Sequence, residues 1–365
     1  MTLVSNRPVT TMAISVAATA SLLLLTACAS DAGGDDTPPG STEVITLDVG
    51  EGGTIDLPLD EVKIGIFLQG SATAFNQAIV RGAEEEAAKH GYVVEAIDAQ
   101  FDLNKQLNQI QTAATNKTYD VMAVEPLVAA SECAAMTKTI PDAGLLSITI
   151  GTPCDTSVLP AGDDLWVPGT FTTIAGDTTS DYTTAFLEAA IELNPGQQKI
   201  ALITGPELDP LVINQKAAIA ELAETNSEVT ITPVFTDWTT PSGLSKTRDY
   251  LLANPDVTVV LSAFSPDLSR GVASAMEEAG VMGTVQFADQ GGTDFSVEQI
   301  VAGNMQFTLP YFPDQYGVKL IQAIHDAQTG KDVPRFISNI PAEYGTTTDP
   351  VVITPENVAD FTPRY

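Results

Sequence analysis

Histidine and basic residues are scarce in this sequence. Its 365 residues include only two histidines, His90 and His325, and 16 lysines and arginines against 47 acidic residues. The formal net charge of −31 gives a surface that repels nucleic acid and anionic lipid headgroups, so neither is an expected partner. Neither histidine neighbours a cysteine, which argues against a zinc site, and no metal or other cofactor is predicted.

Motifs of catalytic and nucleotide-binding sites are also missing. The sequence contains no GxSxG, HExxH, CxxC, Walker or GxGxxG pattern. With so few histidines, a nucleophile activated by histidine is not expected. Acidic residues are abundant, so counting alone does not exclude a glycoside hydrolase that uses two carboxylates. No pattern places two of them at one site, and the sequence favours a protein that is not an enzyme.

The N-terminal apolar segment, residues 12–27, is too short for a stable membrane span. As a helix it would cover about 22–24 Å, against ~30 Å of bilayer hydrocarbon, which is typical of a signal peptide. It ends in Leu25-Thr26-Ala27-Cys28, which resembles the lipobox of bacterial lipoproteins, where the cysteine sulfur takes a diacylglycerol. Residues 1–27 are therefore predicted to be a lipoprotein signal peptide and Cys28 the lipidation site. An ordinary secretory signal is the alternative.

Residues 28–59 are predicted to be the lipidated cysteine and a tether. The stretch ASDAGGDDTPPGST, residues 29–42, has almost no side chain that could join a core. Residues 43–59 fit either more tether or an added edge strand. The expected location is the extracytoplasmic face of the cell membrane, with the protein held there by lipid.

The two remaining cysteines, Cys133 and Cys154, are expected to form a disulfide in an oxidising compartment. The bridge would close a loop of 21 residues and contribute ~3 kcal/mol in the chain-entropy model. Two free buried thiols are the alternative.

Short apolar runs alternate with amphipathic segments along the rest of the chain. The 44% of hydrophobic residues is too high for a disordered chain, and the runs are rich in β-branched residues, as in strands buried on both faces. Alternating strands and helices predict an α/β fold with parallel sheets. The predicted strands are residues 62–68, 92–97, 120–124, 145–150, 199–204, 229–235, 257–262 and 284–288. The predicted helices are residues 75–89, 103–117, 129–139, 178–193, 212–225, 242–253, 268–279 and 313–328.

The series of strands and helices occurs twice, which predicts two doubly wound lobes. The Pro- and Gly-containing stretch 163–177 separates the two series. Lobes of this kind bind ligands in a cleft lined by the carboxyl ends of their strands.

Several stretches in order resemble the type I periplasmic binding proteins, in the ribose- and galactose-binding branch of solute receptors for ABC transporters. They are VKIGIFLQGSATAFNQAIVRGAEEEAAKHGY, AIDAQFDLNKQLNQIQTAATNKTYDVMAVEP, DWTTPSGLSKTRDYLLANPDVTVVLSAFSPDLSRGVASAMEEAG and FPDQYGVKLIQAI. The resemblance covers roughly residues 61–330. It implies two lobes joined by a three-crossing hinge, the first formed by residues 60–166 and 312–334. The second would comprise residues 168–311 and 335–361.

The resemblance also implies a set of cleft residues. Phe75 and Trp238 fall where the family places aromatic rings that stack on sugars, and Asp289 where an acidic residue grips hydroxyls. A helix-start staple, packing between lobes and a helix cap are the respective alternatives. Glu125 and Tyr311 also fall at cleft-facing positions. The complete set of candidate ligand-binding residues is Thr73, Phe75, Asn76, Glu125, Thr152, Asn214, Gln215, Trp238, Ser265, Asp267, Asp289 and Tyr311.

Two departures from the ribose-type pattern bear on the ligand. Gly151-Thr152 stands where that branch has an Asp-Arg pair, and Asn214 and Gln215 lie where it has an arginine. Without these guanidinium groups, ribose itself and carboxylate or phosphate ligands are disfavoured. A neutral sugar or polyol fits better.

The function implied is that of a monomeric receptor that captures a sugar or polyol and delivers it to ABC permease subunits. A ligand-sensing receptor for a membrane signalling partner is the alternative from another class. A surface glycoside hydrolase is the third hypothesis, and turnover of a glycoside would support it.

Overall fold

The computed structural model describes residues 43–365. The predicted signal peptide, Cys28 and residues 29–42 of the predicted tether lie outside the described residues. Within residues 43–365, none of the helices combines the length and hydrophobicity that crossing a bilayer requires.

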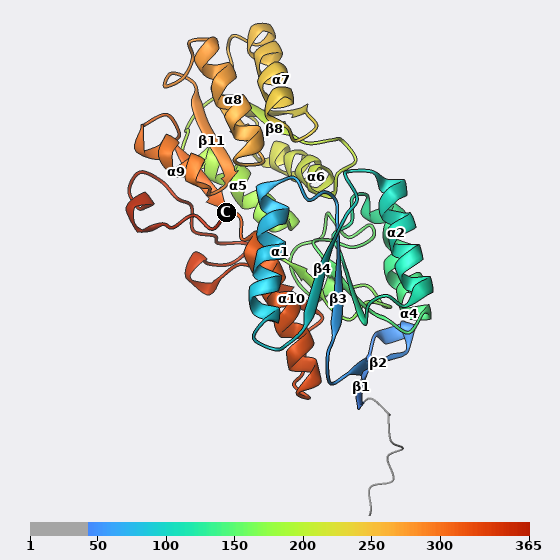
Figure 1. Cartoon of the computed structure of the whole chain (residues 1–365). Helices are drawn as coiled ribbons and strands as arrows, with labels where there is room; N and C mark the ends of the chain where they lie inside the picture. The colour runs from blue at the N-terminus through green and yellow to red at the C-terminus, as the bar shows by residue number, and fades with distance from the viewer. Residues whose placement is uncertain (1–42) are drawn as a thin grey trace, which may run out of the picture. The chain divides into compact units, whose positions relative to one another are not determined.

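Two parallel sheets dominate the described chain, and each carries helices (Figure 1). The first has six strands in the order β13-β7-β6-β5-β3-β4. Its strands are β3 (Lys63–Leu68), β4 (Val93–Asp98), β5 (Val121–Val124), β6 (Leu146–Ile150), β7 (Thr173–Ala175) and β13 (Phe336–Ser338). Every residue of β5 and β6 is buried, as expected for strands covered by helices on both faces.

The second sheet has five strands in the order β12-β11-β10-β8-β9, all parallel. Its strands are β8 (Gln198–Thr204), β9 (Val229–Phe235), β10 (Val259–Ser262), β11 (Gln286–Gly291) and β12 (Phe307–Pro310). If the strands are numbered along the chain within each half, the second sheet has the order 2-1-3-4-5. The first sheet has the same order, with β13 added at its edge. The direction of winding therefore reverses beside the first strand of each sheet, at β3 and β8, and ligands bind at such points in doubly wound folds.

The helices match the predicted periodicity closely. The first sheet carries α1 (Ala74–Ala87), α2 (Leu103–Asn116), α3 (Ala129–Ala134), α4 (Ile140–Asp142) and α10 (Pro313–Gln328). The second half contains α5 (Ser180–Glu192), α6 (Pro210–Thr225), α7 (Thr240–Ala253), α8 (Asp267–Glu278) and α9 (Asp294–Val301). Figure 1 shows α1 and α10, far apart in the sequence, packed side by side on the first lobe.

Polar side chains fix where the helices near the sheet edges begin. Thr73 accepts a hydrogen bond from the backbone N–H of Asn76 at the start of α1. Asp209 does the same for Leu211 in α6, whose first residue is Pro210. These caps satisfy backbone donors that a helix leaves unpaired at its N-terminus. They also place the capping residues at the carboxyl ends of β3 and β8.

The chain crosses between the two sheets three times, after β7, β12 and β13. The resemblance to a three-crossing, two-lobed α/β fold is therefore confirmed. The buried Asp177 joins the crossings: its carboxylate accepts hydrogen bonds from Phe312 N (2.6 Å) and Tyr316 Oη (2.7 Å). Asn339 accepts from Asp177 N (3.1 Å) and donates to Phe312 O (3.1 Å). Burial raises the pKa of Asp177 to about 6, while these donors act in the opposite direction.

Two short strands lie in the first sheet, although the predicted lobe boundaries assign their residues to the second lobe. β7 and β13 belong to the first sheet, where they pair with each other, whereas the sequence assigned residues 168–311 and 335–361 to the second lobe. Each strand has only three residues, which is too short for an alternation pattern to reveal. Only their pairing partners show the sheet to which they belong.

Residues 43–59, assigned above to the tether with an edge strand left open, contain an antiparallel hairpin of β1 (Val44–Asp48) and β2 (Thr54–Pro58). Its inward side chains, including Leu47 and Leu57, belong to the same hydrophobic core as the first sheet. Arg335 donates to Asp48 O (2.9 Å), and its guanidinium lies 4.4 Å from the Trp166 ring centroid. The hairpin is thus part of the first lobe.

Replacing Leu57 with alanine should lower the free energy of unfolding by about 2–4 kcal/mol, because its fully buried side chain would leave a cavity. Urea denaturation would measure the change. Val44→Ala is the matched control in the same hairpin, since Val44 is 48% exposed and should change stability little. Equal, small effects of both substitutions would mean that the hairpin does not contribute to the core.

Candidate functional site

A cavity of about 110 Å³ lies at the carboxyl ends of β3, β5 and β8. A second cavity, of about 70 Å³, shares several wall residues with it, and together they form one cleft. The shared residues come from both halves of the fold: Gln69, Phe75, Glu125, Thr178, Asp209 and Leu211. The cleft is therefore located where the winding of both sheets reverses, as the topology requires for a ligand site.

Two aromatic side chains of the larger cavity occupy equivalent places in the two halves. Phe101 follows β4 and Trp238 follows β9, each of which pairs with the first strand of its half. Both have left-handed backbone, with φ of 56° and 67°. Such conformations cost of the order of 1–3 kcal/mol in non-glycine residues and are concentrated at functional sites. The strain is consistent with rings held in place for a ligand.

A glycine lies directly under each of these two rings. A Cβ added at Gly70 would overlap the ring of Phe101, and one added at Gly205 would overlap the indole of Trp238. Gly70 follows β3 and Gly205 follows β8, so the two halves use the same arrangement. The absence of a side chain at these positions lets each ring lie flat against the backbone.

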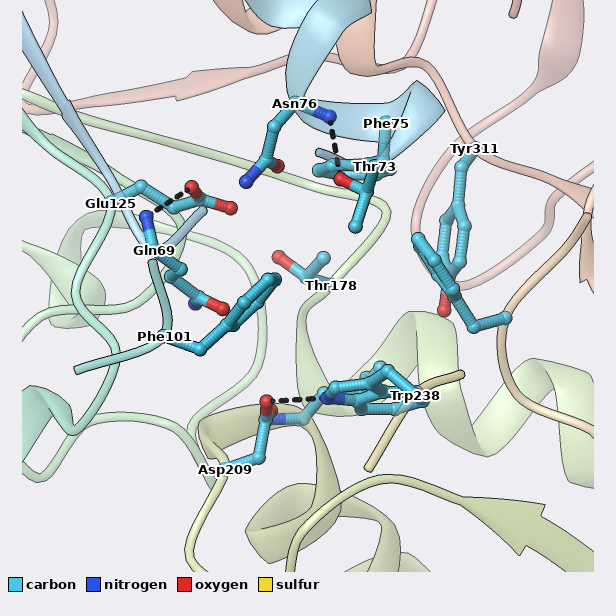
Figure 2. Close-up of a pocket in the computed structure, with 12 residues that line it drawn as sticks. Gln69, Thr73, Phe75, Asn76, Phe101, Glu125, Thr178, Asp209, Trp238 and Tyr311 are labelled. Atoms are coloured by element: carbon cyan, nitrogen blue, oxygen red, sulfur yellow. Dashed lines mark hydrogen bonds between the residues drawn. The ribbon is translucent and has the colours of Figure 1, made fainter. Parts of the chain in front are cut away.

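Phe75 lies within a cluster of aromatic rings at the wall of the larger cavity (Figure 2). Its ring centroid is 5.9 Å from those of Phe264, Tyr311 and Tyr365, and 6.2 Å from that of Tyr316. Phe264 comes from the second half, so this cluster connects the two lobes. With 9% of its surface exposed, Phe75 offers the cavity only part of its ring.

Glu125 and Asp209 are the acidic residues of the cavity wall. Figure 2 shows the Glu125 carboxyl group beside Gln69 and the Asp209 carboxyl group beside Trp238. Burial raises the pKa of Glu125 to about 8 and that of Asp209 to about 6. The Asp209 charge further raises the pKa of Glu125, which indicates that the two groups repel each other across the cleft.

Seven of the residues chosen from the sequence line the cleft. Thr152 lines the smaller cavity, and the others line the larger one: Thr73, Phe75, Asn76, Glu125, Trp238 and Tyr311. These residues were chosen from the family resemblance, and most of them follow a strand or lie at the start of the next helix.

The other five residues chosen from the sequence line neither cavity. Asn214 and Gln215 lie on the buried face of α6, where Asn214 donates to Thr178 O (2.9 Å) and Gln215 accepts from Thr204 (2.6 Å). Asp267 opens α8 outside the cleft wall. The placement of Asn214 favours a structural role, because Thr183 and Thr178 occupy both ends of its amide.

Ser265 and Asp289 point into a buried polar network behind the cleft. Ser265 Oγ lies 2.6 Å from Thr293 Oγ1, and Ser296 Oγ donates to Asp289 (2.9 Å). Burial raises the pKa of Asp289. Asp289 lies within β11 and lines neither cavity, and the helix cap considered as its alternative is wrong as well, because Thr293 caps α9.

The sequence analysis did not select several residues of the cavity wall. They are Gln69, Phe101, Thr178, Asp209, Leu211 and Phe264. Phe101 and Asp209 had a usable signal, since each follows a predicted strand just as the selected residues do. Phe264 follows a predicted strand as well, whereas Thr178 follows β7, which was not predicted.

Cys133 and Cys154 form the expected disulfide, with a Cα–Cα distance of 4.6 Å. The bridge joins the end of α3 to the loop that follows β6. Thr152, two residues before Cys154, lines the smaller cavity. The disulfide therefore holds one rim of the cleft against the first sheet.

The periplasmic binding protein domain matches residues 64–332, which include the cleft and every strand of the two sheets except β13. The chain belongs to this family. Members of the family are binding proteins, so the expectation that the chain is not an enzyme is confirmed. Among residues 43–365, no group of three or more histidine, cysteine or acidic side chains could hold a metal ion.

Solved structures share the fold at low sequence identity. A solute-binding protein from Mycobacterium smegmatis with bound glycerol is 20% identical, with a TM-score of 0.67, over 82% of this chain and 96% of that one. One from Agrobacterium vitis with bound D-fucose is 19% identical, with a TM-score of 0.69, over 81% and 96%. The Caulobacter myo-inositol binding protein is 20% identical, with a TM-score of 0.69, over 83% and 96%. No curated protein matches the sequence.

Gly205→Ala should displace the indole of Trp238 and shift its fluorescence emission to longer wavelength, because the added methyl group takes the space of the ring. The chain has two tryptophans, so a Trp166→Phe background isolates the signal of Trp238. In a Trp238→Phe background, the same substitution should leave the emission of Trp166 unchanged. An unshifted Trp238 signal would show that the glycine does not support the ring.

The double variant Cys133→Ser/Cys154→Ser should lose ~3 kcal/mol of unfolding free energy, because the disulfide restricts the unfolded chain. Urea denaturation with and without a reducing agent would measure the loss. Reductant should lower the stability of the native chain to that of the variant and leave the variant unchanged. A native chain that is insensitive to complete reduction would contradict a stabilising role for the bridge.

Proposed function

We propose that this protein is an extracytoplasmic lipoprotein that captures a sugar or polyol in the cleft and delivers it to an ABC importer. The observation that carries the proposal is the composition of the cleft wall, where aromatic rings lie beside Glu125 and Asp209. Rings stack on the C–H faces of sugars, and carboxyl groups bind hydroxyls in pairs.

The bound molecules of similar structures support this ligand class. Those structures contain glycerol, D-fucose and myo-inositol, all of which are small and rich in hydroxyl groups. The cavity of about 110 Å³ is compatible with a ligand of that size only if the lobes separate slightly or the ligand displaces side chains. Polar groups from both lobes are available to it, since Glu125 belongs to the first and Asp209 to the second.

Closure of the two lobes would complete the binding site. A ligand held first by one lobe gains contacts from the other when the hinge around Asp177 and Asn339 bends. Only a difference in ligand affinity between the open and closed forms drives this change. The closed, monomeric receptor is then the form that the permease subunits recognise.

The predicted lipid anchor suits this task. Acylation of Cys28 would keep the receptor at the extracytoplasmic face of the cell membrane, next to its permease, through two or more acyl chains. Residues 29–42 would act as the spacer. The hairpin at residues 44–58 shortens the tether predicted above, because it packs on the first lobe.

A screen of pentoses, hexoses, polyols and amino acids by thermal shift tests the proposed ligand class. A matching sugar or polyol at 100 times its Kd should stabilise the folded protein by ~2.7 kcal/mol, which raises the melting temperature by several degrees. Trp238→Ala should abolish the shift without unfolding the protein. The control Leu252→Ala, at a side chain that is 77% exposed and remote from the cleft, should leave the shift unchanged. Stabilisation by amino acids alone would refute the sugar assignment.

A further inference from the structure

The cleft contains two buried acidic groups without a basic counter-group. Glu125 and Asp209 line it, and within residues 43–365 no lysine or arginine lines either cavity. A receptor for uncharged sugars can use acidic groups as hydrogen-bond acceptors. Ionising both groups in one small, largely apolar space would remove their hydration and bring like charges together, and these effects raise the pKa of Glu125 to about 8 in the ligand-free protein. A cationic ligand would remove that obstacle to ionisation.

Glu125 is held rigidly with one oxygen engaged. Its Oε2 accepts a hydrogen bond from Gln69 N (3.1 Å), and the residue is only 9% exposed. The fully buried Glu132 adds a third acidic group behind it, with Oε1 unpaired and Oε2 accepting from Val128 N (2.8 Å). All of these donors are uncharged, so the chain brings no positive charge to this end of the cleft to stabilise an ionised carboxylate.

Asp209 is fixed in the same manner on the second lobe. Its two oxygens accept hydrogen bonds from Trp238 Nε1 (3.1 Å) and Leu211 N (2.9 Å). The bond to Trp238 couples the carboxyl group to the indole ring, so both face the ligand as one unit (Figure 2).

Five aromatic rings also line the larger cavity, together with Leu211 and several polar side chains. The rings are those of Phe75, Phe101, Trp238, Phe264 and Tyr311. The faces of such rings attract cations through their quadrupoles, most strongly for tryptophan. Aromatic rings combined with carboxyl groups that have no basic partner form an environment that suits a positively charged nitrogen better than a hydroxyl group.

We infer that the ligand of this cleft carries a protonated amine as well as hydroxyl groups, as in an amino sugar or amino polyol. This inference rests on the proposed function and changes one part of the sequence-based expectation, that of a neutral ligand. The missing arginines still disfavour anions, and the paired carboxylates now favour a cation over a neutral molecule. The amine supplies the counter-charge that the cleft lacks, between Glu125 of one lobe and Asp209 of the other.

The net charge of the whole chain also favours a cationic ligand. With a net charge of −31, the protein attracts cations from solution and repels anions over distances up to the Debye length. The association rate of an amine ligand should therefore fall as the salt concentration rises, whereas that of a neutral sugar should not.

Fluorescence titration of Trp238 in the Trp166→Phe background, at neutral pH and low salt, tests the inference. The probes are matched pairs: D-glucose and D-glucosamine, D-galactose and D-galactosamine, and myo-inositol and an aminodeoxy-inositol. N-acetyl-D-glucosamine and N-acetyl-D-galactosamine carry the same nitrogen without its charge. We expect at least one amine to bind about tenfold or more tightly than its hydroxyl partner, and acetylation to remove the advantage.

Two single variants test which carboxyl groups recognise the positive charge of the amine. Glu125→Gln and Asp209→Asn should each reduce the ratio of amine to hydroxyl affinity several-fold. Glu277→Gln, which removes an exposed carboxylate far from the cleft on α8, is the control and should leave the ratio unchanged. Either of the two cleft variants is sufficient for the test if the other does not fold.

The outcomes separate the inference from the proposed function. Hydroxyl probes that bind as tightly as their amine partners would overturn the inference and leave sugar or polyol capture standing. A preference for amines that persists unchanged in both cleft variants would also overturn it. Failure of every probe of both series to bind would overturn the proposed function, and the inference with it.

Discussion

The Asp177 carboxylate holds the three chain crossings together at one buried point. It accepts hydrogen bonds from the backbone of Phe312 and the hydroxyl of Tyr316, and Asn339 bonds to the backbone of both Asp177 and Phe312. Each of these residues follows a strand that ends at a crossing. Because the three segments share one small polar network, neither lobe can shift against the other without bending all three at once.

The two lobes repeat one design around that hinge. Each has the same strand order, a glycine after its first strand, and an aromatic residue in left-handed backbone lying over that glycine. Each also supplies one carboxyl group to the cleft. The local strain at Phe101 and Trp238 and the desolvation of Glu125 and Asp209 are all unfavourable to the ligand-free protein. Features that are costly to the empty protein and repeated in both lobes are best explained by binding of a ligand between them.

The elements with the clearest periodicity were predictable. The eight predicted strands correspond to β3–β6 and β8–β11, and the eight predicted helices to α1–α3, α5–α8 and α10. Strands β7 and β13 were not predicted, because three residues are too few for a pattern, and the four-residue β12 was missed as well. Residues 43–59 were left as either tether or an added edge strand, and the structure shows a hairpin at residues 44–58. Its burial comes from contacts with residues such as Trp166 and Arg335, which are distant in sequence.

The sequence by itself determined the parallel two-lobed fold, the family resemblance, the disulfide partners and most cleft residues that follow strands. These features depend on local periodicity and on residue order along the chain. Tertiary structure alone decided that Asn214, Gln215, Ser265 and Asp289 lie outside the cleft wall and that Thr178 lies in it. It also decided that Glu125 and Asp209 oppose each other without a basic residue at the cavity wall. The physical reason is that burial and electrostatic environment depend on how separate elements pack, and the two carboxyl groups, 84 positions apart in the sequence (209 − 125), meet only when both lobes are in place.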